Sequence, residues 1–195
     1  MPTIARAGLA ALLMWLLAAP AQAQVSRLPM DVQQVLATLG PKWGSAIREN
    51  IEATAAAFRP LLKARLLELA PTLIAELRLT PFEVSKVELE LVAHGDGAFY
   101  KRHIDTATAR DAAHLRVLSG VYYLHREPRA FSGGALRLYA IGNNARFVDI
   151  EPVCNALLVF PAWAPHEVLP VSVPSGRFAD ARFAINCWLK QRRTV

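Results

Sequence analysis

The chain has 195 residues, of which 53% are hydrophobic and 19% are charged, with a formal net charge of +6. This composition excludes a disordered tail and is sufficient for one domain with a sizeable core. The basic residues are scattered and form no patch interleaved with aromatics, so we expect no nucleic-acid partner. Two cysteines, Cys154 and Cys187, exclude a disulfide scaffold, and their apolar neighbours predict free, buried thiols.

Residues 1–23 have the parts of a secretory signal. Arg6 precedes an apolar run that ends at Ala19, and Ala21-Gln22-Ala23 follows the small-residue pattern of a cleavage site. The run is shorter than the roughly 20 residues that span a bilayer, so we expect no stable membrane span. A buried N-terminal helix is the alternative. The protein is expected to be periplasmic or secreted if the signal is real, and cytoplasmic otherwise.

Residues 24–80 are expected to form a helical support region. Side chains recur there at the three- to four-residue spacing of one helix face, namely at Leu61, Leu62, Arg65, Leu66, Leu69, Leu73 and Leu77. We interpret this leucine stripe as core packing. Pro60 and Pro71 are expected in first turns, because proline disfavours the helical conformation of the residue before it.

Residues 81–195 have the texture of short strands separated by turns, and Ser132-Gly133-Gly134 is one of the separators. The expected strands cover residues 84–91, 99–103, 115–124, 135–141, 147–150, 156–160, 167–171 and 182–189. Strands of this length and spacing indicate a sandwich or barrel of jelly-roll type. With the helices first, the predicted class is α+β.

The sharpest local motif is His103-Ile104-Asp105. In an extended segment, positions i and i+2 point to the same face, so the imidazole and the carboxylate would project side by side. A buried carboxylate is costly unless a cation or hydrogen bonds satisfy it. A metal ion would do so, although a three-residue pattern is weak evidence when it stands alone.

His166 is the expected third ligand, because it opens a strand between two prolines, where an edge position can aim a side chain into a cavity. Two imidazoles and one carboxylate suit non-haem Fe(II) and equally a catalytic zinc ion. The ligand set therefore leaves an oxygenase and a hydrolase both open. The other histidines, His94, His114 and His125, are interpreted as solvated or satisfied polar residues.

Arg182 lies among apolar neighbours in Ala181-Arg182-Phe183-Ala184, which places its guanidinium on the inward face of a strand. A buried guanidinium requires an anion, and its fork matches a carboxylate. A dicarboxylic co-substrate would supply one. The alternatives are a structural ion pair with Asp149 or Glu151, or a solvated edge residue.

Several motifs in order make the chain similar to the 2-oxoglutarate- and Fe(II)-dependent dioxygenases of the prolyl 4-hydroxylase-like branch. They are His103-x-Asp105, Gly133-Gly134-Ala135-Leu136-Arg137-Leu138, Phe160-Pro161, His166-Glu167-Val168-Leu169-Pro170-Val171, Arg182-Phe183-Ala184 and Trp188. The similarity covers roughly residues 84–190. It implies a double-stranded β-helix (jelly-roll) core with supporting N-terminal helices, so residues 81–195 are expected to be the dioxygenase domain.

The resemblance implies that His103, Asp105 and His166 are catalytic iron ligands. It also implies that Arg182 and Tyr123 hold the distal carboxylate of 2-oxoglutarate. The gap from His166 to Arg182 is longer than is usual in the family, which makes Arg177 an alternative. Where relatives often carry a tyrosine, this chain has His94.

The implied activity is hydroxylation of a C–H bond with release of succinate and CO2, with Fe(II), 2-oxoglutarate and O2 required and ascorbate as an auxiliary. The substrate is expected to be a prolyl or other peptidyl residue, or a small molecule. A metal-dependent hydrolase and a non-catalytic jelly-roll binding module are the alternatives. The oligomeric state is not indicated. Export conflicts with the cytoplasmic abundance of 2-oxoglutarate and ferrous iron.

Overall fold

The computed structural model describes residues 46–108 and 113–193. The predicted signal at residues 1–23 and the first part of the predicted support region lie outside this range. None of the helices described is both long and apolar enough to cross a membrane. Cys187 is buried and Cys154 half-buried, and both are free thiols, as expected.

A single long helix, α3 (Ala46–Glu76), forms the described part of the support region. Its predicted leucine stripe is buried against the sheet at Leu62, Leu66, Leu73 and Leu77, but the expectation is wrong for Leu61, which is 40% exposed. The expected breaks are wrong, because Pro60 and Pro71 lie inside the helix. Each interior proline costs about 3 kcal/mol, whereas each buried large apolar side chain contributes about 1.5–3 kcal/mol. Packing of the stripe therefore outweighs both prolines.

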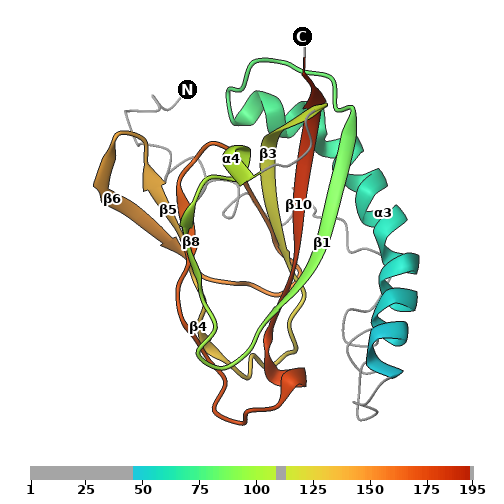
Figure 1. The fold of residues 1–195 in the computed structure, drawn as a ribbon, viewed down its shortest axis with the longest axis vertical. Helices are drawn as coiled ribbons and strands as arrows, with labels where there is room; N and C mark the ends of the chain where they lie inside the picture. Colours follow the sequence, from blue (N-terminus) through green and yellow to red (C-terminus); the bar gives the residue numbers. More distant parts are fainter. Residues whose placement is uncertain (1–45, 109–112, 194–195) are drawn as a thin grey trace, which may run out of the picture.

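The larger sheet has the antiparallel order β1-β10-β3-β7. Its strands are β1 (Lys86–His94), β10 (Arg182–Arg192), β3 (His114–Tyr123) and β7 (Leu157–Pro161). Strand alternation gives it two faces. Leu89 and Leu91 of β1 pack outward with Leu189 of β10 beneath α3, which lies along this sheet in Figure 1. The alternate residues of both strands therefore face the second sheet.

The second sheet has the order β2-β8-β5-β6. Its strands are β2 (Tyr100–His103), β8 (His166–Val168), β5 (Leu136–Ala140) and β6 (Asn143–Ile150). A second core, which includes Leu136, Leu138, Phe160 and Ala184, lies between the sheets. Figure 1 shows β5, β6 and β8 on the side of the molecule opposite α3. Two facing four-stranded sheets after a helix form the predicted α+β fold with a jelly-roll core.

The Ser132–Gly134 segment differs from its expected role as a simple separator. Ser132–Gly133 is a short strand, β4, that pairs with β9 (Val171–Ser172). Gly134 has a φ of +70°, and its backbone N–H donates to the carbonyl of Pro170 at 3.0 Å. A side chain at this left-handed position would be strained. The glycines therefore allow the chain to pair closely with β9 beside Arg182.

Candidate metal centre and co-substrate pocket

His103, Asp105 and His166 converge, and one ligand atom from each lies within 4.8 Å of those of the other two. The antiparallel register of β2 and β8 sets His103 directly opposite His166. His103 Nε2 lies 3.3 Å from Asp105 Oδ1, and His166 Nε2 lies 3.7 Å from Asp105 Oδ2. Two nitrogens and one oxygen therefore face a common point.

Two details of the predicted geometry are wrong. β2 ends at His103, and Asp105 begins a short helix, α4 (Asp105–Thr108), so the motif is not extended throughout. The turn is fixed by the backbone N–H groups of Asp105 and Thr106, which donate to the carbonyl of Ala162 at 2.9 and 3.1 Å. β8 is also an interior strand, because β2 and β5 flank it. His166 is therefore held on both sides by sheet pairing.

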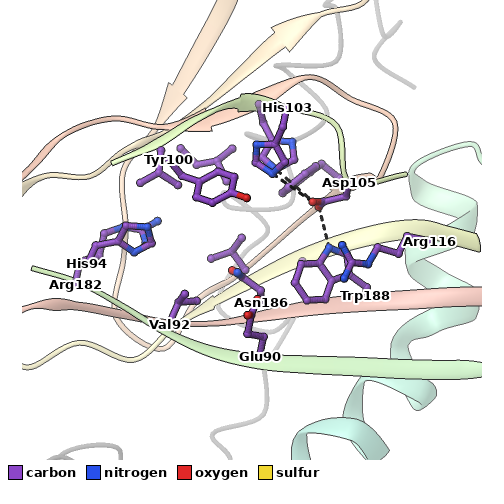
Figure 2. Close-up of a pocket in the computed structure, with 16 residues that line it drawn as sticks. Glu90, Val92, His94, Tyr100, His103, Asp105, Arg116, Arg182, Asn186 and Trp188 are labelled. Carbon is purple, nitrogen blue, oxygen red and sulfur yellow. Dashed lines mark hydrogen bonds and ion pairs between the residues drawn. The ribbon is translucent and has the colours of Figure 1, made fainter. Parts of the chain in front are cut away.

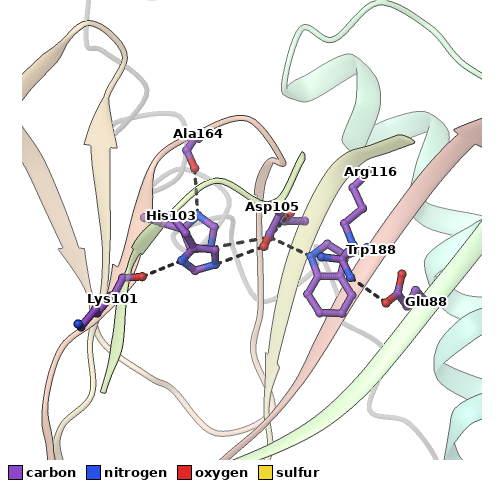
Figure 3. Close-up of polar contacts among 9 residues, drawn as sticks. Glu88, Lys101, His103, Asp105, Arg116, Ala164 and Trp188 are labelled. Carbon is purple, nitrogen blue, oxygen red and sulfur yellow. Dashed lines mark hydrogen bonds and ion pairs between the residues drawn. The ribbon is translucent and has the colours of Figure 1, made fainter. Parts of the chain in front are cut away.

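Backbone carbonyls orient both imidazoles, and Figure 3 shows His103 beside the carbonyl of Lys101. Nδ1 of His103 lies 2.9 Å from the carbonyl of Lys101, and Nδ1 of His166 lies 2.9 Å from the carbonyl of Ala164. A carbonyl only accepts, so Nδ1 carries the proton and Nε2 offers a lone pair. Burial lowers the pKa of His166. Both findings favour neutral imidazoles that are ready to bind a cation.

Asp105 is buried and held through one carboxylate oxygen. Ser119 Oγ donates to Oδ2 at 2.6 Å, and Trp188 Nε1 donates to the same oxygen at 2.8 Å. Burial alone would raise the pKa of Asp105, but hydrogen bonds and the facing histidines lower it to about 2. Asp105 is therefore ionised at neutral pH. Both of these hydrogen bonds go to Oδ2, and neither goes to Oδ1.

Trp188 is itself held in place by an ionic cluster. The Arg116 guanidinium stacks over the indole ring, 3.7 Å from its centroid. Arg116 Nη2 donates to Glu88 Oε1 at 2.7 Å, and Lys190 pairs with the other oxygen of Glu88. Figure 3 shows the connected path from Glu88 through Arg116 and Trp188 to Asp105. This path restrains the indole whose N–H orients the carboxylate.

The three convergent residues line a pocket of about 290 Å³ between the two sheets. Figure 2 shows His103, Asp105 and Trp188 at one end of this pocket and His94 and Arg182 at the other. His114 and His125 do not line it. One end of the pocket therefore carries the three groups that can bind a metal cation, and the other end carries the positive charge of Arg182. Together the two ends suit an elongated anion.

Arg182 is 1% exposed, and it has no carboxylate partner among the described residues. Its Nη1 donates to His94 Nδ1 at 3.3 Å, while Nε and Nη2 have no hydrogen-bond partner in the described part of the chain. Burial lowers its pKa, yet a guanidinium stays charged in proteins. Leaving such a donor unpaired in a buried site is costly, so the site favours an anionic ligand.

The structural alternatives for Arg182 are wrong. Asp149 accepts from Arg137 Nε at 2.7 Å, and Glu151 accepts from Arg129 at 3.0 Å. Both acids are therefore already paired on the surface. Arg182 is also fully buried, which excludes a solvated edge residue.

Arg177 and Tyr123 lie in different surroundings. The side chain of Arg177 is 66% exposed and pairs with Asp180 at 2.7 Å, and it does not line the pocket. Tyr123 does not line the pocket either, but it is buried beside Arg182, whose Cζ lies 5.0 Å from the tyrosine ring centroid. Tyr123 Oη has no hydrogen-bond partner within the described ranges, and burial raises its pKa. The phenol is therefore a neutral donor next to the guanidinium.

His94 lies on the pocket wall rather than in solvent. Burial, with a further contribution from the Arg182 charge, lowers its pKa to about 4. Its Nδ1 accepts from Arg182, because a guanidinium only donates, so the proton is on Nε2. His94 therefore orients Arg182 in the place where relatives often carry a tyrosine.

Several pocket residues were not predicted from the sequence, namely Glu90, Tyr100, Arg116 and Asn186. Asn186 could have been found, because it lies four residues from Arg182 on the same strand face, and its register partner Glu90 would follow once β1 is paired with β10. Tyr100 and Arg116 required knowledge of how the sheets are stacked. Their positions depend on contacts between segments that are distant in the sequence.

Comparison with known proteins identifies the family. A model of the 2OG-Fe(II) oxygenase superfamily matches residues 89–190. An uncharacterized PKHD-type hydroxylase of Synechocystis is 38% identical over 143 residues, which are 70% of this chain and 46% of that protein. The mouse prolyl hydroxylase EGLN3 is 33% identical over 100 residues, 48% of this chain and 36% of that protein.

Among solved structures, a Pseudomonas putida prolyl-4-hydroxylase aligns with a TM-score of 0.47 and 25% identity over 93% of this chain and 81% of that one. The chain spans less than half the length of each curated relative named above. The family match covers just over half of the chain and includes His103, Asp105, His166 and Arg182. The chain therefore belongs to the 2OG-Fe(II) oxygenase superfamily.

Proposed function

We propose that this protein is a 2-oxoglutarate- and Fe(II)-dependent hydroxylase. In this proposal His103, Asp105 and His166 hold the iron, and Arg182 with Tyr123 holds the distal carboxylate of 2-oxoglutarate. The observation that carries it is the buried guanidinium of Arg182, which has two nitrogens without a partner in the described chain and shares a pocket with the three converging residues.

The donor set fits ferrous iron, because two neutral imidazoles and one carboxylate leave the opposite coordination positions open. Bound Fe(II) would supply the redox chemistry that activates dioxygen. Oxidative decarboxylation of 2-oxoglutarate puts one oxygen atom into succinate with loss of CO2, and the other enters a substrate C–H bond as a hydroxyl group.

The protein's own residues position the co-substrate. The Arg182 fork matches a carboxylate bidentately, and Tyr123 can donate its phenolic proton to the same group. His94 restrains Arg182 through its 3.3 Å hydrogen bond. Val92, Leu136 and Phe160 give the pocket apolar walls, which exclude water from the reacting groups. Fixing both ends of 2-oxoglutarate makes the reacting groups neighbours, which supplies much of the catalytic advantage.

A metal-dependent hydrolase and a binding module fit less well. A hydrolase would account for the three ligands but would leave the buried Arg182 without an anion. A non-catalytic module would give no reason for two imidazoles with free Nε2 atoms around an ionised carboxylate. Membership of the oxygenase family also favours the hydroxylase.

An anaerobic titration tests the proposal. We expect Fe(II) and 2-oxoglutarate together, but neither alone, to produce a visible metal-to-ligand charge-transfer band, followed in air by release of succinate. His166→Ala should abolish both signals. Arg182→Ala should weaken 2-oxoglutarate binding by about tenfold or more, since a charged hydrogen-bonding partner is lost. Arg177→Ala is the control and should behave as wild type. An unchanged signal in Arg182→Ala would contradict the assignment.

The proposed substrate is a prolyl or other peptidyl residue. Its support is the PKHD-type hydroxylase and prolyl hydroxylase relatives, which the chain matches over part of their length. Ascorbate is the proposed auxiliary reductant, and the test is whether it prolongs succinate production.

Residues 1–23 are proposed to direct export. N-terminal sequencing of protein from its host would find residue 24 first if they are cleaved, and Met1 if the proposal is wrong.

A further inference from the structure

The pocket floor is built by paired residues of β1 and β10. The register sets His94 opposite Arg182, Val92 opposite Ala184, Glu90 opposite Asn186 and Glu88 opposite Trp188. Strand alternation points these residues to the pocket face, while the intervening leucines pack beneath α3. Six of these eight residues line the pocket, all except Glu88 and Ala184, and they form its floor between the Arg182 end and the Trp188 end.

Glu90 lines the pocket but is not among the residues proposed to hold the co-substrate. Its side chain lines the pocket and makes no ion pair or hydrogen bond with another described residue. Neither guanidinium group in the pocket wall pairs with Glu90, since Arg116 bonds Glu88 and Arg182 lies four strand positions from the Glu90–Asn186 pair. Glu90 is exposed, so water solvates its carboxylate in the free protein, and a cation that pairs with it inside the pocket would have to belong to a ligand.

Glu90 lies between the metal end and the Arg182 end of the pocket. Asn186, its register partner, lies two residues from Trp188 and four from Arg182, or roughly 7 Å and 13 Å along the strand. Trp188 bonds Asp105, so Glu90 lies nearer the metal end of the pocket than the Arg182 end. Figure 2 shows Glu90 and Asn186 on the floor, across the pocket from Tyr100. Tyr100 is 53% exposed, so this side of the pocket is reached from solvent.

We propose that Glu90 is a specificity-determining residue that receives a protonated amine or guanidinium of the substrate, next to the carbon that is hydroxylated. The inference rests on the proposed hydroxylase function and names its substrate class. Asn186 supplies a neutral carbonyl oxygen that can accept from the same cation. An anionic neighbour would be repelled by Glu90 and disfavoured.

The shared chemistry has two sources, a Lys or Arg side chain of a peptide and the amino group of a free amino acid. The substrate set is therefore acetylated, amidated hexapeptides with one proline flanked by Lys, Arg, Gln or Glu, together with free lysine, arginine and proline. Each is incubated with the Fe(II) enzyme, 2-oxoglutarate and ascorbate. Hydroxylation is measured as a gain of one oxygen by mass spectrometry.

We expect the Lys- and Arg-containing compounds to have a kcat/KM roughly fivefold above their Gln counterparts, the size of effect for a partly exposed charge pair. The kcat/KM of the peptides should exceed that of the free amino acids if the cation is a Lys or Arg side chain. The reverse order would identify the cation as the amino group of a free amino acid. Glu90→Gln should abolish the charge preference, and Glu90→Lys should invert it. Glu83→Gln, a change to an exposed carboxylate outside this pocket, is the matched control and should retain the preference.

A binding measurement decides the question if no compound is hydroxylated. Protein loaded with Mn(II) and N-oxalylglycine is titrated with the same set, and the cationic compounds should bind the wild type roughly fivefold more tightly than Glu90→Gln. Equal affinities, or an unchanged preference in Glu90→Gln, would overturn the inference. Absence of the charge-transfer band and of succinate would instead overturn the proposed function. The binding measurement with Mn(II) and N-oxalylglycine still tests the charge preference in that case.

Discussion

At the residue scale, the metal centre depends on hydrogen bonds that fix each donor atom. Carbonyl acceptors set the tautomers of His103 and His166, and Ser119 and Trp188 hold Asp105 through Oδ2. Such outer contacts reduce the number of orientations that the ligands can adopt before the metal binds. Metal affinity is therefore expected to depend on residues that do not touch the metal.

Trp188→Phe tests this dependence. Phenylalanine keeps the aromatic ring beneath Arg116 but removes the N–H that donates to Asp105 at 2.8 Å. We expect divalent-metal affinity to fall about tenfold, the lower end for loss of an outer-shell partner. Anaerobic calorimetric titration with Mn(II) measures it. Trp163→Phe, a change at a 41% exposed position outside the pocket, is the control. Equal affinities for Trp188→Phe and wild type would show that Ser119 alone suffices.

At the scale of the elements, the position of Arg182 depends on the close approach of the Gly133–Gly134 segment. A Cβ at Gly134 would lie 2.6 Å from Arg182 Cδ and 2.8 Å from Val171 Cγ2. The guanidinium end of the pocket therefore has no room for a side chain on this segment. The tight turn is a condition for placing the buried guanidinium of Arg182.

Gly134→Ala is expected to displace Arg182 and weaken 2-oxoglutarate binding by about tenfold, with a loss of roughly 1–3 kcal/mol of stability from backbone strain. Gly142→Ala is a matched control, because its φ is +72° but an added Cβ would meet nothing within 4 Å. That variant should show the strain without the binding defect. Calorimetry and thermal unfolding measure the two effects, and equal binding by both variants would contradict the expectation.

α3 stabilises the sheet from behind through its leucine stripe. Leu66 is 1% exposed and Leu67 is 41% exposed, so adjacent residues face the core and the surface. Leu66→Ala should cost about 2–5 kcal/mol of unfolding free energy, and Leu67→Ala under about 0.5 kcal/mol. Urea denaturation measures both. Similar losses in the two variants would contradict the described helix face.

At the scale of the whole molecule, buried neutral histidines make stability depend on pH. Burial, with smaller contributions from Arg129 and Arg182, lowers the pKa of His125 from 6.5 to about 4. Between these values the unfolded chain binds more protons than the folded chain, so stability falls as the pH falls. Asp105 acts in a lower window, because its stabilising charge is present above 3.8 and lost as the pH falls toward about 2.

His125→Phe is expected to reduce the slope of unfolding free energy against pH between 6.5 and 4. Nδ1 of His125 has no hydrogen-bond partner in the described ranges, and its ring packs against Phe131 at 5.0 Å, so an apolar ring fits the site. Urea denaturation of the metal-free protein at pH 7, 5.5 and 4.5 measures the slope. Parallel curves for variant and wild type would exclude this histidine as a source of the dependence.

The sequence alone determined most of the strands and the residues that converge as His103, Asp105 and His166. Alternation and turn residues locate strands well, because a period of two is a local property. The residue types of His103, Asp105, His166 and Arg182, together with their order, indicated the chemistry and the family. Local propensity failed at Pro60 and Pro71, where packing of the leucine stripe outweighs the cost of an interior proline.

Only the tertiary structure decided which charges are paired. Asp149 and Glu151 bond other arginines, Arg177 bonds Asp180, and Arg182 alone of these arginines faces the pocket. Glu90 likewise has no ion-pair partner among the described residues, because the nearby Arg116 bonds Glu88. Pairing is a competition among groups brought together from distant segments, so it is settled by the packing of the sheets and is not encoded in any local pattern.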